Sequence, residues 1–264
     1  IYAAGDGVEQ DYTKAREWFL KAANKNDTMS AYNLALIYKN GLGVPKNDKE
    51  AYKYFLIAAN KNYAQAQYML GTMVEKGQGA KKDLKEAFSW FLKAAKQGHI
   101  LSEYRVGKMY RLGEGVAKSD TEAKKWYELS ANKGNAFAQV NLGMMYKQGV
   151  ATKQDYKEAF NWFEKSANQK NILGQLNLAL MYQNGLGIEK DLKEAFKLYQ
   201  LASDEGNSSS AQYNLGLMYL KGDGIEKNID KTIEYWIKSS EQGFEVAKNS
   251  LEKLCKESPN SCKK

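Results

Sequence analysis

The chain has very little of what metal centres and membrane spans require. Its 264 residues include one histidine and two cysteines, whereas a zinc site needs about three or four converging His, Cys or carboxylate ligands. No run approaches the ~20 apolar residues of a membrane-spanning helix. There are only two prolines, against 22 glycines and 18 tyrosines, which is not the composition of a disordered chain. We therefore expect a folded chain with no metal site, no cofactor and no membrane span.

The charge is mildly basic, with 39 Lys and Arg against 31 Asp and Glu and a net charge of +8. Both signs are spread along the chain, so acidic partners are favoured only weakly. Four tryptophans are expected in core register rather than alternating with lysine on an exposed surface: Trp18, Trp90, Trp126 and Trp162. Nucleic acid is therefore not the expected partner.

Glycine recurs at a nearly constant interval along the whole chain. The interval is 36 residues five times and 37 once, at Gly5, Gly41, Gly77, Gly113, Gly149, Gly185 and Gly222. A second glycine stands two residues after each of these, except after Gly149, where Ala151 takes its place. A tyrosine stands three residues before each, except before Gly77, where Val74 takes its place. Chance does not keep several columns in register, so the chain is built from repeats.

Each repeat predicts two helices joined by the Gly-x-Gly turn. In the first helix, Ser30, Leu34, Ile37 and Tyr38 fall on one face, and the second helix has the same stripe in the Ala-x-x-Trp-Phe-x-x-Ala-Ala segment from Ala87. The first glycine suits a left-handed residue that ends a helix. Four aspartates are placed to cap second helices at their N-termini: Asp11, Asp83, Asp155 and Asp191.

One helix pair cannot cover both of its apolar sides, but stacked pairs can. The sequence therefore predicts an all-α fold, a right-handed α-solenoid of stacked antiparallel helix pairs. The expected segments are a truncated first repeat at 1–27, repeats at 28–62, 63–98, 99–134, 135–171, 172–206 and 207–243, and a C-terminal helix and tail at 244–264. The first segment lacks a first helix, so we expect the natural protein to continue upstream of Ile1.

The repeat unit resembles the Sel1-like repeat, a relative of the tetratricopeptide repeat with a longer period. The pattern Ala-x-x-x-Leu-Gly-x-x-Tyr-x-x-Gly-x-Gly, followed by Ala-x-x-Trp-(Tyr/Phe)-x-x-Ala-Ala, is clear at 66–95, 138–167 and 211–240. The resemblance implies a non-enzymatic scaffold or adaptor that binds a protein or peptide, often in bacterial envelope, secretion or host-interaction settings. A cysteine-rich, secreted branch ties each repeat with a disulfide, but this chain has Ala or Ser in those places.

Relatives of that branch imply an alternative function, a cell-wall-related amide or β-lactam hydrolase or a penicillin-binding protein. Two Ser-x-x-Lys matches exist, Ser130 with Lys133 and Ser250 with Lys253, but no Ser-Asp-Asn or Lys-Thr-Gly completes either site. The Gly-x-Gly segments do not continue as a dinucleotide or phosphate loop. His99 is expected to be a surface turn residue. No catalytic residue is assigned.

The candidate binding site is the concave wall, which first helices line in such stacks. We number each first helix from its starting small residue as zero: Ser30, Ala66, Ser102, Ala138, Gly174 and Ala211. Positions 0, 4, 7 and 8 are expected in the core, and positions 2, 6 and 9 on the opposite side, with position 3 at the border. Position 3 is asparagine in four of six copies: Asn33, Asn141, Asn177 and Asn214.

By resemblance to tetratricopeptide proteins, these asparagines could grip an extended or carboxylate-ended peptide. Further expected groove residues are basic or aromatic: Arg105, Lys108, Arg111, Lys39, Lys147, Tyr68 and Tyr104. The alternative is that the asparagines bond neighbouring loops or helix backbones and only shape the solenoid.

Cys255 and Cys262 are seven residues apart, with a Pro259-Asn260 turn between them. A disulfide here would pin the last helix and indicate an oxidising compartment, so we expect a periplasmic or secreted protein. Free thiols in a cytoplasmic protein are the alternative.

Overall fold

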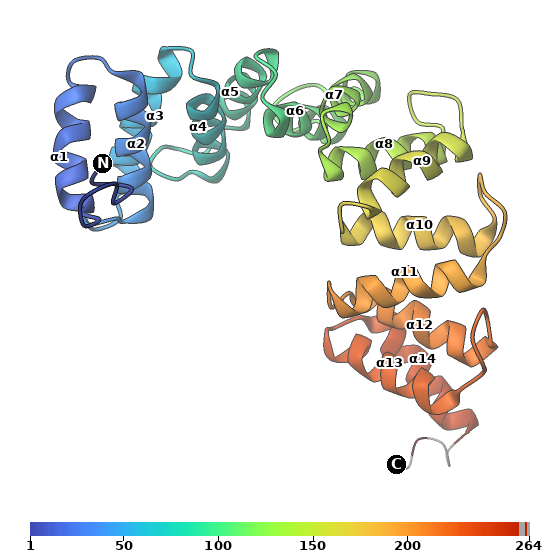
Figure 1. Ribbon diagram of the computed structural model, residues 1–264. Coiled ribbons are helices and arrows are strands. Elements are labelled where there is room, and N and C mark those ends of the chain that lie inside the picture. The colour runs from blue at the N-terminus through green and yellow to red at the C-terminus, as the bar shows by residue number, and fades with distance from the viewer. Residues whose placement is uncertain (259–261, 263–264) are drawn as a thin grey trace. The chain divides into compact units, whose positions relative to one another are not determined.

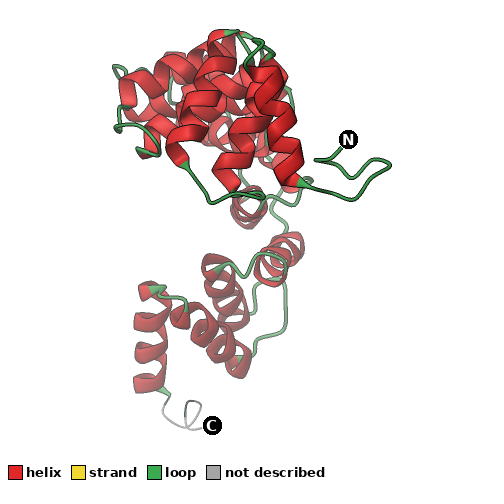
Figure 2. Cartoon of the chain, turned by 90° about the vertical axis from the view of Figure 1, so that its left-hand side faces the viewer, coloured by secondary structure: helices red, strands yellow, loops and turns green. Residues whose placement is uncertain are grey.

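The computed structural model describes residues 1–258 and 262, and within them it contains fourteen α-helices and no strand (Figures 1 and 2). Contacts divide the chain into two compact units, residues 1–133 and 134–264. The helices of unit 1 are α1 (Tyr12–Ala23), α2 (Thr28–Asn40), α3 (Asp48–Asn60), α4 (Ala64–Lys76), α5 (Leu84–Lys96), α6 (Ile100–Leu112) and α7 (Asp120–Asn132). Those of unit 2 are α8 (Ala136–Gln148), α9 (Tyr156–Ala167), α10 (Ile172–Asn184), α11 (Leu192–Asp204), α12 (Ser209–Lys221), α13 (Ile229–Glu241) and α14 (Glu245–Glu257).

Even-numbered helices are the first helices of the repeats, and odd-numbered helices are the second helices. Within each repeat the first helix packs along the second, and within each unit the second helix packs against the first helix of the next repeat. The predicted all-α solenoid of stacked helix pairs is therefore confirmed. Its core is a continuous series of clusters rather than one centre, as expected when each repeat contacts its neighbours.

The helix ends follow from the repeated residues. The Asp83 carboxylate accepts hydrogen bonds from the backbone N–H groups of Lys85 and Glu86, and Asp155 and Asp191 do the same at α9 and α11. At α1, Asp11 accepts from the backbone N–H of Lys14 alone. Six first helices end at a glycine in the left-handed region, with φ between 66° and 78°. Both predictions about the helix ends are confirmed.

Glycine inside four first helices allows an aromatic ring to approach the backbone. A Cβ placed on Gly143 would lie 2.7 Å from the ring of Phe163, and Gly71, Gly107 and Gly216 have equally close rings. These glycines stand at position 5 and are buried. The residues at positions 0, 4 and 7 are buried too, apart from Ser30 at position 0 of α2. The tyrosines at position 8 are only half-buried, so the core stripe is centred nearer position 5 than the sequence predicted.

The prediction that Trp18 lies in core register is wrong. Its side chain is 60% exposed, whereas Trp90 and Trp162 are below 10%. Trp90 packs into a cluster that includes Leu70 and Tyr54, from its own and the preceding repeat. No helix precedes α1 in this chain, so the ring of Trp18 has no such partner.

Candidate functional site

A buried polar column at position 1 of the first helices ties the two helices of a repeat together. The side chains of Gln67, Glu103, Gln139, Gln175 and Gln212 occupy it, all at most 4% exposed. In three repeats, the buried glutamine accepts a hydrogen bond at its Oε1 from Nε2 of a second glutamine, which stands 30 residues later in the sequence. The donor–acceptor pairs are Gln97–Gln67, Gln169–Gln139 and Gln242–Gln212, at 2.7–2.8 Å. Burial of the amides in these three pairs is compatible with stability because their buried oxygen atoms are hydrogen-bonded.

One repeat replaces the amide pair with charges. Lys133 Nζ donates to Glu103 Oε1 at 2.5 Å, at the same two positions. Ser130 in the same repeat donates from its hydroxyl to the carbonyl of Ile100 at 2.9 Å, and Ser166 makes the equivalent bond to Ala136. The Ser130–Lys133 motif is thus accounted for by contacts between helices, rather than by a nucleophile and its base.

The asparagine column lies on the side of the first helices away from the buried stripe. Asn33, Asn141, Asn177 and Asn214 are all half-buried. The Nδ2 atoms of Asn141 and Asn177 donate to backbone carbonyls four residues earlier, at 2.9 and 2.8 Å. One N–H of each amide therefore serves its own helix, which leaves Oδ1 and the second N–H as the groups that each side chain offers to a ligand.

The basic residues of unit 1 are partly neutralised. Arg105 of α6 pairs with Glu75 of α4, and its guanidinium stands 5.3 Å from the ring centre of Phe91. Arg111 pairs with Asp120 at 2.8 Å. Lys108 lies half-buried on the same helix as the two arginines. This local arrangement resembles an ion-paired surface more than a free basic spot.

Two other predicted lysines lie near the ends of first helices. Burial, followed by the nearby charges of Lys76 and Lys46, lowers the pKa of Lys39. The carboxylate of Asp48, which pairs with Lys46, opposes this shift, so both signs of charge lie near the end of α2. Lys147 occupies the equivalent end of α8, in unit 2.

The two predicted groove tyrosines are packing residues. The ring of Tyr68 stands 5.8 Å from Phe91 and 4.9 Å from His99, and that of Tyr104 stands 6.0 Å from Tyr127. His99 is the N-cap of α6, and its Nδ1 accepts from the backbone N–H of Ser102. Burial lowers the pKa of His99. The histidine therefore has a structural role as a half-buried cap.

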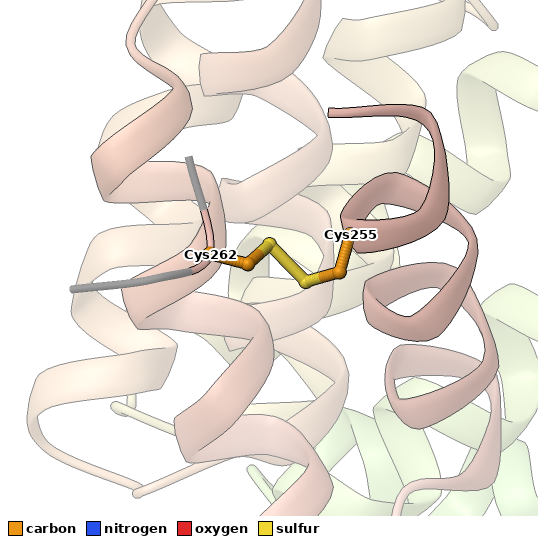
Figure 3. Close-up of a disulfide and its surroundings, with 2 residues drawn as sticks. All are labelled: Cys255 and Cys262. Atoms are coloured by element: carbon orange, nitrogen blue, oxygen red, sulfur yellow. A yellow bond between two sulfur atoms is a disulfide. The ribbon is translucent and has the colours of Figure 1, made fainter. Parts of the chain in front are cut away.

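Cys255, in the last turn of α14, is joined by a disulfide to Cys262, with the Cα atoms 5.5 Å apart (Figure 3). Pro259 and Asn260, the expected turn, lie outside the described residues. The link is local, since seven residues separate the two cysteines. It returns the chain to the end of the final helix.

In the part of the chain that the structure describes, no three His, Cys, Asp or Glu side chains gather as a metal-binding group. In the same residues, no helix has the length and apolar character needed to cross a membrane.

The repeat geometry agrees with one family model, the Sel1 repeat, which matches residues 1–27, 28–63, 64–99, 100–135, 136–171, 172–207 and 209–244. The chain belongs to the Sel1-repeat family. Among solved structures it is similar to a protective antigen present in uropathogenic Escherichia coli strains that displays an SLR fold, with 35% identity and a TM-score of 0.88 over 96% of this chain. The chain spans 54% of that protein's length.

A Sel1 repeat protein from Oxalobacter formigenes is also similar, with 33% identity and a TM-score of 0.74. The match covers 81% of this chain and 85% of that protein. No curated protein matches this chain. The comparisons thus establish the family and its fold.

Sequence reasoning missed a further row on these Sel1 repeats. The residue just before position 0 is a large, exposed apolar side chain in five first helices: Met29, Leu101, Phe137, Leu173 and Val246. It stands four residues before the asparagine column, and so on the same side of the helix. The sequence shows that this row is periodic. It does not show that the row is exposed, because an apolar residue at the start of a helix can equally belong to the core.

Proposed function

We propose that the chain is a non-enzymatic interaction scaffold whose first helices bind a segment of another protein. The observation that carries this proposal is the asparagine column. Asparagine costs a helix interior roughly half a kcal/mol relative to alanine, yet it recurs at one solvent-side position in four of six first helices. Repeated use of an unfavourable residue at an open position is more readily explained by a ligand than by helix stability.

The test uses a photo-crosslinking amino acid in place of Asn177 in the full chain, expressed in its native host. A matched control places it at Lys197, an exposed position on the second helix α11. A protein cross-linked from position 177 and not from position 197 is then purified as the partner. The affinity of this partner is measured for the wild type and for Asn141→Ala/Asn177→Ala.

The double variant should remain folded, since alanine is the better helix former. Its affinity should fall by about tenfold, as expected for losing two modest hydrogen bonds. Unchanged affinity, with an unchanged circular dichroism spectrum, would remove the asparagine column as the binding site.

We also propose a periplasmic or secreted location. The disulfide between Cys255 and Cys262 supports it, because such links persist in oxidising compartments. The similar protein from uropathogenic Escherichia coli is a protective antigen, which is compatible with exposure outside the cytoplasm. Thiol titration of protein isolated from its host without reductant should find no free cysteine. Two titratable thiols would instead indicate the cytoplasm.

A further inference from the structure

Three of the four first helices of unit 2 expose an apolar side chain in one register, and α12 has Ser210 there. Phe137 of α8, Leu173 of α10 and Val246 of α14 are 51%, 50% and 51% exposed, and each stands immediately before position 0. We call these three residues the apolar row. Single exposed apolar residues are ordinary, but a row repeated on one face indicates an interaction surface.

A second apolar row follows on the same side of these helices. Met144, Leu180 and Leu217 are half-buried at position 6. Residues seven apart lie on one side of a helix. In α8 and α10, the asparagine therefore lies between one residue of the first apolar row and one residue of the second. The surface of these two helices therefore offers apolar contact on both sides of the Oδ1 of Asn141 or Asn177. Helices α8 and α10 also contact each other directly, which makes the rows continuous between them.

Three of the four first helices of unit 2 carry charge of one sign, whereas α14 carries both signs. Helices α8, α10 and α12 contain no Asp or Glu, and their only charged residues are Lys147 and Lys221. In unit 1, α2 is similar, with Lys39 as its only charged residue, but α4 carries Glu75 and α6 carries Glu103. An acidic ligand would meet lysines on these three helices of unit 2, whereas a basic ligand would meet no carboxylate there.

The hydrogen-bonding atoms decide the conformation of the ligand. Nδ2 of Asn141 and of Asn177 uses one of its two N–H groups within its own helix, so each side chain offers a ligand one acceptor, Oδ1, and one remaining N–H donor. A helical ligand uses its backbone N–H and C=O groups internally, apart from its end turns, whereas an extended segment leaves both kinds of group free on its edge.

From these observations we infer that the face formed by the first helices α8, α10 and α12 binds an extended partner segment with apolar and acidic side chains. The apolar side chains lie against Phe137 and Leu173, the asparagine Oδ1 atoms accept backbone N–H groups, and the acidic residues face Lys147 and Lys221. This inference rests on the proposed scaffold function and specifies the partner's chemistry.

The test measures binding of labelled synthetic peptides to the full chain by fluorescence anisotropy. Peptides of about ten residues span three helices, at about 3.3 Å per residue against 8–10 Å per helix. The first peptide alternates leucine and aspartate, the second leucine and lysine, and the third serine and aspartate. Only the leucine–aspartate peptide should bind well, and Phe137→Ser/Leu173→Ser should weaken its binding by at least about tenfold.

The matched control is Leu201→Ser/Ile237→Ser. These residues are exposed to a similar degree, 44% and 40%, but lie on the second helices α11 and α13. This variant should bind the peptide as the wild type does. Equal binding of the leucine–lysine peptide, an equal loss in the control variant, or no binding of the leucine–aspartate peptide would each overturn the inference.

The two proposals can fail separately. If Asn141→Ala/Asn177→Ala weakens the cross-linked partner while Phe137→Ser/Leu173→Ser changes neither partner nor peptide binding, the scaffold function stands and the inference about ligand chemistry is wrong.

Discussion

Lys133 donates to the buried carboxylate of Glu103 at the place where three other repeats join two glutamines. The distance between Lys133 Nζ and Glu103 Oε1 is 2.5 Å, and the Glu103 side chain is 2% exposed while that of Lys133 is 39% exposed. The same two positions therefore hold either a neutral pair or an ion pair, and each choice satisfies a buried acceptor. In these four repeats the two positions hold matched partners, and the repeat with Gln175 does not.

The first prediction concerns this exchange. Lys133→Met should destabilise the chain by about 2 kcal/mol, less than the cost of breaking a fully buried pair, because Lys133 is partly exposed. Glu103→Gln/Lys133→Gln recreates the amide pair of the other repeats and should lie within about 1 kcal/mol of the wild type. Urea unfolding followed by circular dichroism measures both. Equal stability of Lys133→Met and the wild type would show that the ion pair contributes nothing.

The second prediction concerns Gln175, whose Oε1 is buried without a hydrogen-bond partner among the described residues. The residue 30 positions later is Glu205, and a carboxylate has no proton to donate at neutral pH. Glu205→Gln supplies the donor found in three other repeats and should stabilise the chain by about 1 kcal/mol. Thermal unfolding measures the gain, with Glu189→Gln in an exposed loop as the control. A gain of the same size in the control would assign it to net charge instead.

The regular features of the fold could be predicted from the sequence because each depends on local chemistry repeated in register. Gly41 and its equivalents end helices, and Asp83 and its equivalents begin them. The buried amide column could not be recognised in the same way, because a glutamine on a helix resembles a surface residue. One signal was present: Glu103 and Lys133 replace two glutamines together, 30 residues apart.

The use of the asparagine column by a ligand stays a prediction. The asparagines are half-buried, and Asn141 donates to its own backbone, a bond that helical spacing alone does not specify. Arg105 was expected to be available to a ligand, and its pairing with Glu75 depends on how close two first helices pack. The exposure of Phe137 could not be read from the sequence either, because an apolar residue at the start of a helix resembles a core residue there.

The third prediction is a pH dependence that originates at His99. Burial lowers the pKa of His99 in the folded chain, and the neutral ring accepts a hydrogen bond from Ser102 N–H at the start of α6. A lowered folded pKa favours the neutral form. The stabilisation of the folded chain by the neutral His99 cap is therefore complete above the pKa of histidine in the unfolded chain, about 6.5. It is lost as pH falls through the pKa of His99 in the folded chain. The loss should reach about 1 kcal/mol, the usual contribution of a cap.

His99→Asn is the matched variant, because Asn135 and Asn171 cap α8 and α10 at the equivalent positions. It keeps a cap and removes the titration. The difference in unfolding free energy between wild type and variant should change between about pH 7 and pH 5, and a constant difference would show that His99 is not the titrating group.

The fourth prediction sets two opposing effects against each other at Gly143. Alanine occupies the equivalent position at Ala35 and Ala179, and replacing glycine by alanine in a helix usually gains about 1 kcal/mol. However, a Cβ on Gly143 would lie 2.7 Å from the ring of Phe163, which is fully buried. Forcing a packed ring to move costs about 1–3 kcal/mol, so Gly143→Ala should be neutral to destabilising by up to about 2 kcal/mol.

Gly143→Ala/Phe163→Leu tests the cause, because a smaller side chain should lower the cost of the added methyl group relative to that in the wild-type background. A clear stabilisation by Gly143→Ala alone would mean that α9 shifts freely against α8, which the close packing of Phe163 argues against.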